Sequence, residues 1–153
     1  MSLSLQPLDK QSSVSGQLGP DDMKEIAAQG FGAVVNNRPD REAMFGQPRT
    51  ADLKQAAEAA GLLFVDLPFP GPNVTPEQVR ALATVLDNRD RRVVAFCKSG
   101  MRSALIWAAA EVSAGRSLDE VLAAARNAGQ NLDPIGERIT ALAAAARQLQ
   151  ERG

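Results

Sequence analysis

Short apolar runs that alternate with helix-forming segments constrain the fold of this chain more than any other feature. Three such runs occupy residues 31–35, 62–67 and 92–96, and each contains valine. Each run is too short for an ordinary helix, which favours a buried strand. Strands that alternate with helices form a parallel sheet covered by helices. We therefore predict an α/β fold with a parallel-type central sheet of about 4–5 strands flanked by helices.

Helix boundaries are indicated by caps and by apolar spacing. Pro20 with two aspartates opens one helix, Thr75 with Pro76 opens another, and Ser117 caps a third. The predicted helices are residues 20–29, 51–60, 76–86, 103–113, 117–128 and 134–150. We also expect an irregular start over 1–12, a short edge strand over 14–18, a loop over 41–49 and a solvated turn over 89–92. All of these belong to a single domain spanning 1–153.

Histidine is absent from the sequence, tyrosine is absent as well, and the one cysteine is Cys97. These counts exclude Ser-His and Cys-His catalytic pairs and His-ligated metal sites, and one cysteine cannot build a thiolate zinc site. We therefore expect no metal and no cofactor. One cysteine cannot form an internal disulfide either, which fits a reducing, cytoplasmic location.

The net charge of −1 argues against a nucleic acid or an anionic membrane as the partner. The N-terminus lacks the basic and apolar regions of a signal peptide, and no apolar stretch approaches the ~20 residues that span a bilayer. The expected partners are small molecules, and the sequence does not determine the oligomeric state.

Cys97 directly follows the predicted strand over 92–96, and a short loop joins it to the next helix. Such a loop gathers backbone N–H groups at a helix N-terminus, which favours an anion and lowers a thiol pKa. We therefore predict that Cys97 is a nucleophile, that Arg102 binds an oxyanion, and that Ser103 hydrogen-bonds the sulfur. The predicted anion-binding loop consists of Lys98, Ser99, Gly100 and Met101.

Four segments resemble one bacterial family: residues 31–40, the Gln47-Pro48 pair, residues 64–68 and residues 97–107. The family is the phosphatase-like domain of beta-lactamase-hydrolase-like proteins, and the resemblance covers roughly residues 3–145. It implies a cysteine-phosphatase-like fold of the dual-specificity type. Some members are fused to a persulfide dioxygenase and are described as sulfurtransferases. The spacing of Cys97 and Arg102 is that of single-domain rhodaneses, because phosphatase loops are one residue longer.

Two reactions are open to this loop, together with a non-catalytic role in binding an anion or a persulfide. In sulfur transfer, Cys97 takes a sulfur atom from a small donor, thiosulfate or a persulfide, and passes it to a thiol acceptor. In phosphate-ester hydrolysis a phosphocysteine forms, and the leaving group needs a proton. Residues 68–74 contain no carboxylate, and the short loop crowds a tetrahedral phosphate. Sulfur transfer is therefore favoured over phosphatase activity.

Three further polar residues are candidates for the pocket or for a proton donor. Arg38 and Asp40 leave a predicted strand at its carboxyl end, so they either line the pocket or form a structural ion pair. Asp66 ends the next strand, just before residues 68–74. Its carboxylate is either the general acid of a phosphatase or, as we favour, an acceptor that anchors the loop.

Overall fold

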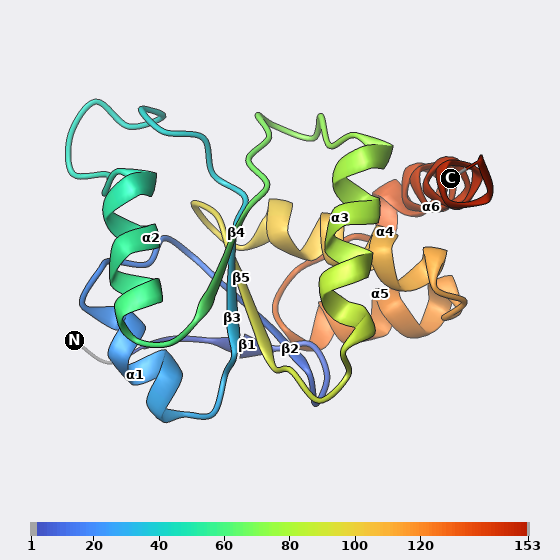
Figure 1. The fold of residues 1–153 in the computed structure, drawn as a ribbon. Helices are drawn as coiled ribbons and strands as arrows, with labels where there is room; N and C mark the ends of the chain where they lie inside the picture. Colours follow the sequence, from blue (N-terminus) through green and yellow to red (C-terminus); the bar gives the residue numbers. More distant parts are fainter. Residues whose placement is uncertain (1–2, 153) are drawn as a thin grey trace.

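Within residues 3–152, which the computed structural model describes, five strands form one central sheet (Figure 1). They are β1 (Gln6–Pro7), β2 (Ser12–Ser15), β3 (Ala33–Asn36), β4 (Leu63–Asp66) and β5 (Val93–Phe96). The order in the sheet is β1-β2-β5-β3-β4. β1 runs antiparallel to β2, and the other neighbouring pairs are parallel. The predicted α/β class and the predicted number of strands are confirmed.

Helices cover both faces of this sheet. They are α1 (Asp22–Ala28), α2 (Thr50–Ala59), α3 (Pro76–Asp87), α4 (Met101–Ser113), α5 (Leu118–Asn127) and α6 (Gly136–Arg152), with a 3-10 turn η1 at Asp133–Ile135. Each α-helix ends within two residues of its predicted limits. In Figure 1, α1 and α2 lie on one side of the sheet and α3 to α6 on the other. Each side has its own apolar cluster against the sheet.

The N-terminal segment is more ordered than the sequence predicted. Within the described part of the expected irregular start, residues 6–7 form β1 and residue 12 begins β2. The expected edge strand over 14–18 is also wrong, because β2 lies between β1 and β5. β2 holds this place by parallel pairing with β5. The side chain of Gln11, just before β2, adds hydrogen bonds from its Nε2 to the backbone oxygens of Leu86, Asn88 and Arg91. β2 is serine-rich yet wholly buried, so its polarity concealed a core strand.

The turn over residues 89–92 was expected to be solvated, but two of its arginines contact other parts of the fold. Arg89 donates to both carboxylate oxygens of Glu111, whose side chain is fully buried in α4. Arg92 stacks over the ring of Phe31 at 4.0 Å from its centroid. A buried carboxylate without a cation would be costly, so Arg89 compensates for the burial of Glu111.

The register of the parallel strands brings three strand ends to one edge of the sheet. Asn36 of β3 pairs with Asp66 of β4 on one side and with Phe96 of β5 on the other. The segments that begin at 37, 67 and 97 therefore leave the sheet side by side, at the top in Figure 1. α4 follows the last of them and is buried from Ser103 to Val112, so the core fixes its position. None of the helices over residues 3–152 has the length and hydropathy of a membrane span.

Leu82 of α3 tests the packing on the α4 side of the sheet. Its side chain is 1% exposed, so Leu82→Ala is expected to lower the free energy of unfolding by about 2–5 kcal/mol. Leu63 on the edge strand β4 is 44% exposed and provides the control. Leu63→Ala is expected to cost less than about 1 kcal/mol in urea unfolding. Equal losses in the two variants would contradict this assignment of the core.

Candidate active site

Cys97 lies at the carboxyl end of β5, beneath the first turn of α4. Its backbone N–H donates to the carbonyl of Ser15 at 3.3 Å, and its side chain is 1% exposed. The loop turns back over the sulfur at Gly100, whose φ of +98° is in the left-handed region. This turn brings the N–H of Gly100 to 3.0 Å from the Cys97 Sγ.

The environment of the sulfur favours the thiolate. Burial raises the pKa of the Cys97 thiol, because a charge is poorly solvated in the interior. The backbone N–H groups of Ser103, Ser99 and Gly100 oppose that effect, and together they bring the pKa below its ordinary value. Of the predicted loop residues, Ser99 and Gly100 direct their backbone N–H groups at the sulfur, together with Ser103 at the start of the helix.

Ser103 lies beside the sulfur, but its hydroxyl proton has another acceptor. The hydroxyl donates to Asn37 Oδ1 at 2.8 Å, and the Asn37 side chain is oriented by its own donation to the Leu67 carbonyl at 3.0 Å. A hydroxyl carries one proton, so Ser103 serves either Asn37 or the sulfur at one time. The stabilisation of the thiolate in this geometry therefore depends mainly on the backbone amides.

Arg102 is held by a carboxylate that the sequence analysis did not identify. Its two terminal nitrogens donate to the two oxygens of Glu42, at 2.6 and 2.8 Å, and one also donates to the carbonyl of Phe69 at 3.1 Å. Such a bidentate pair fixes the plane of the guanidinium. Hydrogen bonding to Glu42 raises the pKa of Arg102, and the nearby Cys97 sulfur acts in the same direction.

Glu42 joins two arginines. Arg38 is 6% exposed, and its Nε donates to Glu42 Oε1 at 2.9 Å, while its terminal nitrogen donates to Gln17 Oε1 at 2.9 Å. Hydrogen bonding to Arg102, together with the weaker influence of Arg38, lowers the pKa of Glu42 to about 2. Glu42 is therefore ionised at neutral pH and has no proton to donate. The ion pair of Arg38 is thus with Glu42 and not with Asp40, the partner that the sequence suggested.

The carboxylates proposed as acids each accept hydrogen bonds from neighbouring segments. Asp66 accepts from Asn36 Nδ2 at 2.8 Å, across the pair of strands β3 and β4. Asp40 accepts from the backbone N–H and the hydroxyl of Thr50, at 2.9 and 2.8 Å, and so orders the start of α2. Each of these carboxylates therefore ties one segment of the chain to another. Within residues 3–152, no group of three or more His, Cys, Asp or Glu side chains is arranged to hold a metal ion.

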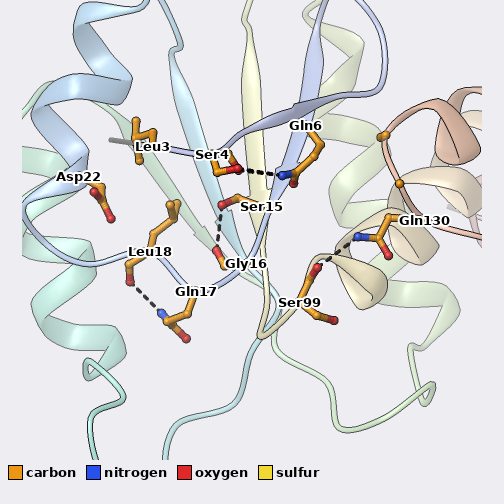
Figure 2. Close-up of a pocket in the computed structure, with 12 residues that line it drawn as sticks. Leu3, Ser4, Gln6, Ser15, Gly16, Gln17, Leu18, Asp22, Ser99 and Gln130 are labelled. Carbon is orange, nitrogen blue, oxygen red and sulfur yellow. Dashed lines mark hydrogen bonds between the residues drawn. The ribbon is translucent and has the colours of Figure 1, made fainter. Parts of the chain in front are cut away.

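Two clefts flank the cysteine loop. One, of about 460 Å³, borders Arg102 and Glu42, and its other walls are mainly apolar: Gly71, Pro72, Met101, Leu105 and Ile135. Met101 is 41% exposed there, although it begins α4. The second cleft, of about 540 Å³, lies on the β2 side and includes Ser99 and Gln130 in its wall (Figure 2). Lys98 of the same loop is exposed to solvent.

A five-stranded α/β fold with a cysteine loop between β5 and α4 defines a phosphatase-like domain, and comparisons with known proteins agree. Residues 4–115 match the family model described as beta-lactamase hydrolase-like protein, phosphatase-like domain. The chain belongs to this family, as the sequence motifs indicated.

Two relatives named beta-lactamase hydrolase-like protein come from Agrobacterium fabrum and Xylella fastidiosa. The first is 33% identical over 109 residues, which is 71% of this chain and 25% of the relative. The second is 31% identical over 115 residues, which is 74% of this chain and 26% of the relative. The chain therefore spans about a quarter of the length of these curated relatives.

Solved structures show the same fold. A suspected phosphatase from Neisseria meningitidis is 31% identical and has a TM-score of 0.75. The alignment includes 90% of this chain and 96% of the Neisseria chain. The phosphatase Tk-PTP in its active form has a TM-score of 0.71 at 21% identity, with 97% of this chain and 99% of that one aligned. These likenesses confirm the predicted cysteine-phosphatase-like fold.

Sequence reasoning missed Glu42 and Gln130, which both contact the cysteine loop or its arginine. Glu42 falls in the loop over 41–49, where no periodic pattern marks a functional side chain. One signal was available: Glu42 stands four residues after Arg38, close to the end of a buried strand. Gln130 follows a helix-terminating glycine and carries no comparable signal.

The low pKa of Glu42 predicts a specific pH dependence of stability. Its pKa in the folded chain is about 2, against an ordinary value of 4.5. A depressed carboxyl pKa contributes stability above the unfolded value, and that contribution is lost as the pH falls from about 4.5 towards 2. In urea unfolding across this window, Glu42→Gln should flatten the acid-side decline, whereas Glu58→Gln on the exposed face of α2 should keep it. An unchanged decline in Glu42→Gln would contradict the ion pair.

Proposed function

We propose that this domain is a cysteine-dependent phosphatase acting on small organic phosphate monoesters. The observation that carries the proposal is the buried Cys97 sulfur, which has a lowered pKa, receives loop N–H groups and lies next to Arg102. The family model and the Neisseria structure, both described as phosphatase-like or phosphatase, support the choice of phosphorus as the electrophile.

The first step is attack of the Cys97 thiolate on phosphorus. The S–P bond forms as the P–O bond to the leaving group breaks, and the electron pair of that bond departs with the ester oxygen. The loop N–H groups and Arg102 stabilise the phosphoryl oxygens as their charge is redistributed. Water then attacks the phosphocysteine, releases inorganic phosphate and restores the thiolate.

The carboxylates around the loop restrict which esters are good substrates. Glu42 is ionised and paired with Arg102, while Asp66 and Asp40 anchor neighbouring segments. Because Glu42 has no proton to give and Asp66 and Asp40 already accept hydrogen bonds from neighbouring segments, esters whose leaving group is stable as an anion should react best. Missing general acid catalysis typically costs about 10²–10⁴-fold with a poor leaving group. Aryl phosphates are accordingly the expected class.

The cleft beside Arg102 supports an organic ester rather than a bare inorganic anion. Its volume of about 460 Å³ falls within the range of small-molecule sites, and its walls include Met101, Leu105 and Ile135. An apolar group attached to a phosphate held by Arg102 has apolar surface to contact in this cleft.

Sulfur transfer is the second candidate, and the spacing of Cys97 and Arg102 favours it. Here the thiolate attacks the outer sulfur of thiosulfate, the S–S bond breaks, and sulfite leaves with the electron pair. The resulting Cys97 persulfide passes its outer sulfur to a thiol acceptor, which restores the thiolate. Sulfite leaves without a proton, so this reaction also suits a site without a general acid.

A paired assay on the purified domain tests the proposal. We expect hydrolysis of p-nitrophenyl phosphate that is abolished in Cys97→Ser and reduced about 10²–10³-fold in kcat/KM in Arg102→Ala. Asp66→Asn and Asp40→Asn should retain the activity within about threefold, because neither carboxylate is assigned proton transfer. Thiosulfate:cyanide transfer is measured on the same four variants and the parent.

Three results would contradict parts of this proposal. If the parent transfers sulfur but does not hydrolyse the phosphate ester, and Cys97→Ser loses that transfer, the domain is a sulfurtransferase and not a phosphatase. A large loss of phosphatase activity in Asp66→Asn or Asp40→Asn would show that this carboxylate acts as a general acid. The restriction to aryl esters would then be removed. Activity in neither assay, with an oxyanion bound at the loop, leaves the domain as a non-catalytic binding module.

A further inference from the structure

One peptide unit in the cysteine loop makes two contacts in opposite directions. Its N–H is that of Gly100 and donates to Cys97 Sγ at 3.0 Å. Its carbonyl is that of Ser99 and accepts from Gln130 Nε2 at 3.1 Å, the bond drawn in Figure 2. Because the carbonyl and the N–H lie in one rigid plane, fixing one fixes the direction of the other.

The position of Gln130 is set by the end of α5. Gly129 takes a φ of +86° and terminates the helix, and the N–H of Gln130 donates to the carbonyl of Ala125 at 2.9 Å. Ser117 caps the other end of the same helix, accepting from the N–H of Glu120. Gln130 is therefore presented to the loop from an anchored element.

Little space is left between the cysteine loop and the side chain of Gln130. A Cβ placed on Gly100 would lie 2.8 Å from Gln130 Nε2, which is too close, and the φ of +98° there disfavours any side chain. The amide of Gln130 thus occupies the space that the absent side chain of Gly100 leaves. The charged group that faces the sulfur is Arg102, which belongs to a different helix.

We propose that Gln130 is a positioning residue that holds the Ser99–Gly100 peptide with its N–H directed at the Cys97 sulfur. Donation to the carbonyl also polarises the peptide, which strengthens the hydrogen bond that its N–H donates. Without Gln130, this peptide is free to rotate its carbonyl towards the sulfur, which destabilises the thiolate. The inference rests on Cys97 being the nucleophile of the proposed function.

The test measures the thiol directly, through the pH dependence of Cys97 alkylation by iodoacetamide. Gln130→Met keeps the length of the side chain and removes the donor, whereas Gln130→Glu replaces the donor with an acceptor. We expect the pKa of Cys97 to rise by about 0.5–1 pH unit in Gln130→Met and at least as much in Gln130→Glu. Gln148→Ala, at an exposed site on α6, should leave the pKa of the parent. Thermal unfolding of each variant verifies that the fold is retained.

A Cys97 pKa within 0.2 pH unit of the parent in folded Gln130→Met would overturn the inference, whatever the Glu variant does. The outcome is separate from that of the proposed function, because alkylation requires no turnover. A parent with a lowered thiol pKa but neither enzymatic activity would refute the proposed function and leave the role of Gln130 standing. An active parent with unaffected Gln130 variants would refute the role of Gln130 alone.

Discussion

A cysteine sulfur held almost out of contact with water is the constraint on which the rest of this site depends. The side chain of Cys97 is 1% exposed, and burial alone disfavours its charged form. Backbone N–H groups compensate for that burial, and they reach the sulfur only because Gly100 takes a left-handed conformation at the start of α4. The burial of α4 among α3, α5 and α6 in turn fixes where that helix begins.

The position of the Arg102 guanidinium near the Cys97 sulfur is also fixed by neighbouring groups. Glu42 orients Arg102 through one ion pair and is itself held by Arg38 through another. The positions of the three charged groups therefore depend on one another. The same ion pairs lower the pKa of Glu42 to about 2, so the carboxylate that orients Arg102 cannot supply a proton. We therefore expect the site to suit reactions in which the nucleophile and the oxyanion need stabilisation while the leaving group needs no proton. Both candidate reactions meet that description, for phosphorus with aryl esters and for sulfur with thiosulfate.

Much of the fold was predictable because local signals agreed with one another. Thr75 and Pro76 mark the start of α3, Gly129 follows the end of α5, and valine-rich runs form β3 and β5. β2 was placed wrongly because Ser12, Ser13 and Ser15 read as surface residues, although the sheet buries them. The position of β2 depends on long-range pairing with β5, which leaves no periodic pattern in the sequence.

The position of Cys97 in a loop between a strand and a helix was also predictable, since Cys97, Gly100 and Arg102 lie within six consecutive residues. Glu42 and Gln130 were not, because they meet the loop only through the topology of the sheet and the end of α5. Local spacing can identify a chemical group, but the residues that orient it come from distant segments. The preference for sulfur over phosphorus rested on the length of the cysteine loop and on the absence of a carboxylate from residues 68–74. The cleft beside Arg102 and the family comparisons instead support our proposal of an organic phosphate.

Trapping the covalent intermediate tests the central claim most directly. The parent and Cys97→Ser are mixed with an aryl phosphate, or separately with thiosulfate, quenched in acid, and examined by intact-protein and peptide mass spectrometry. We expect a phosphoryl group on the peptide that contains Cys97 in the parent and none in Cys97→Ser. A single added sulfur atom on that peptide would keep Cys97 as the nucleophile and change the electrophile from phosphorus to sulfur. Turnover of either substrate with no adduct on Cys97 would contradict the claim.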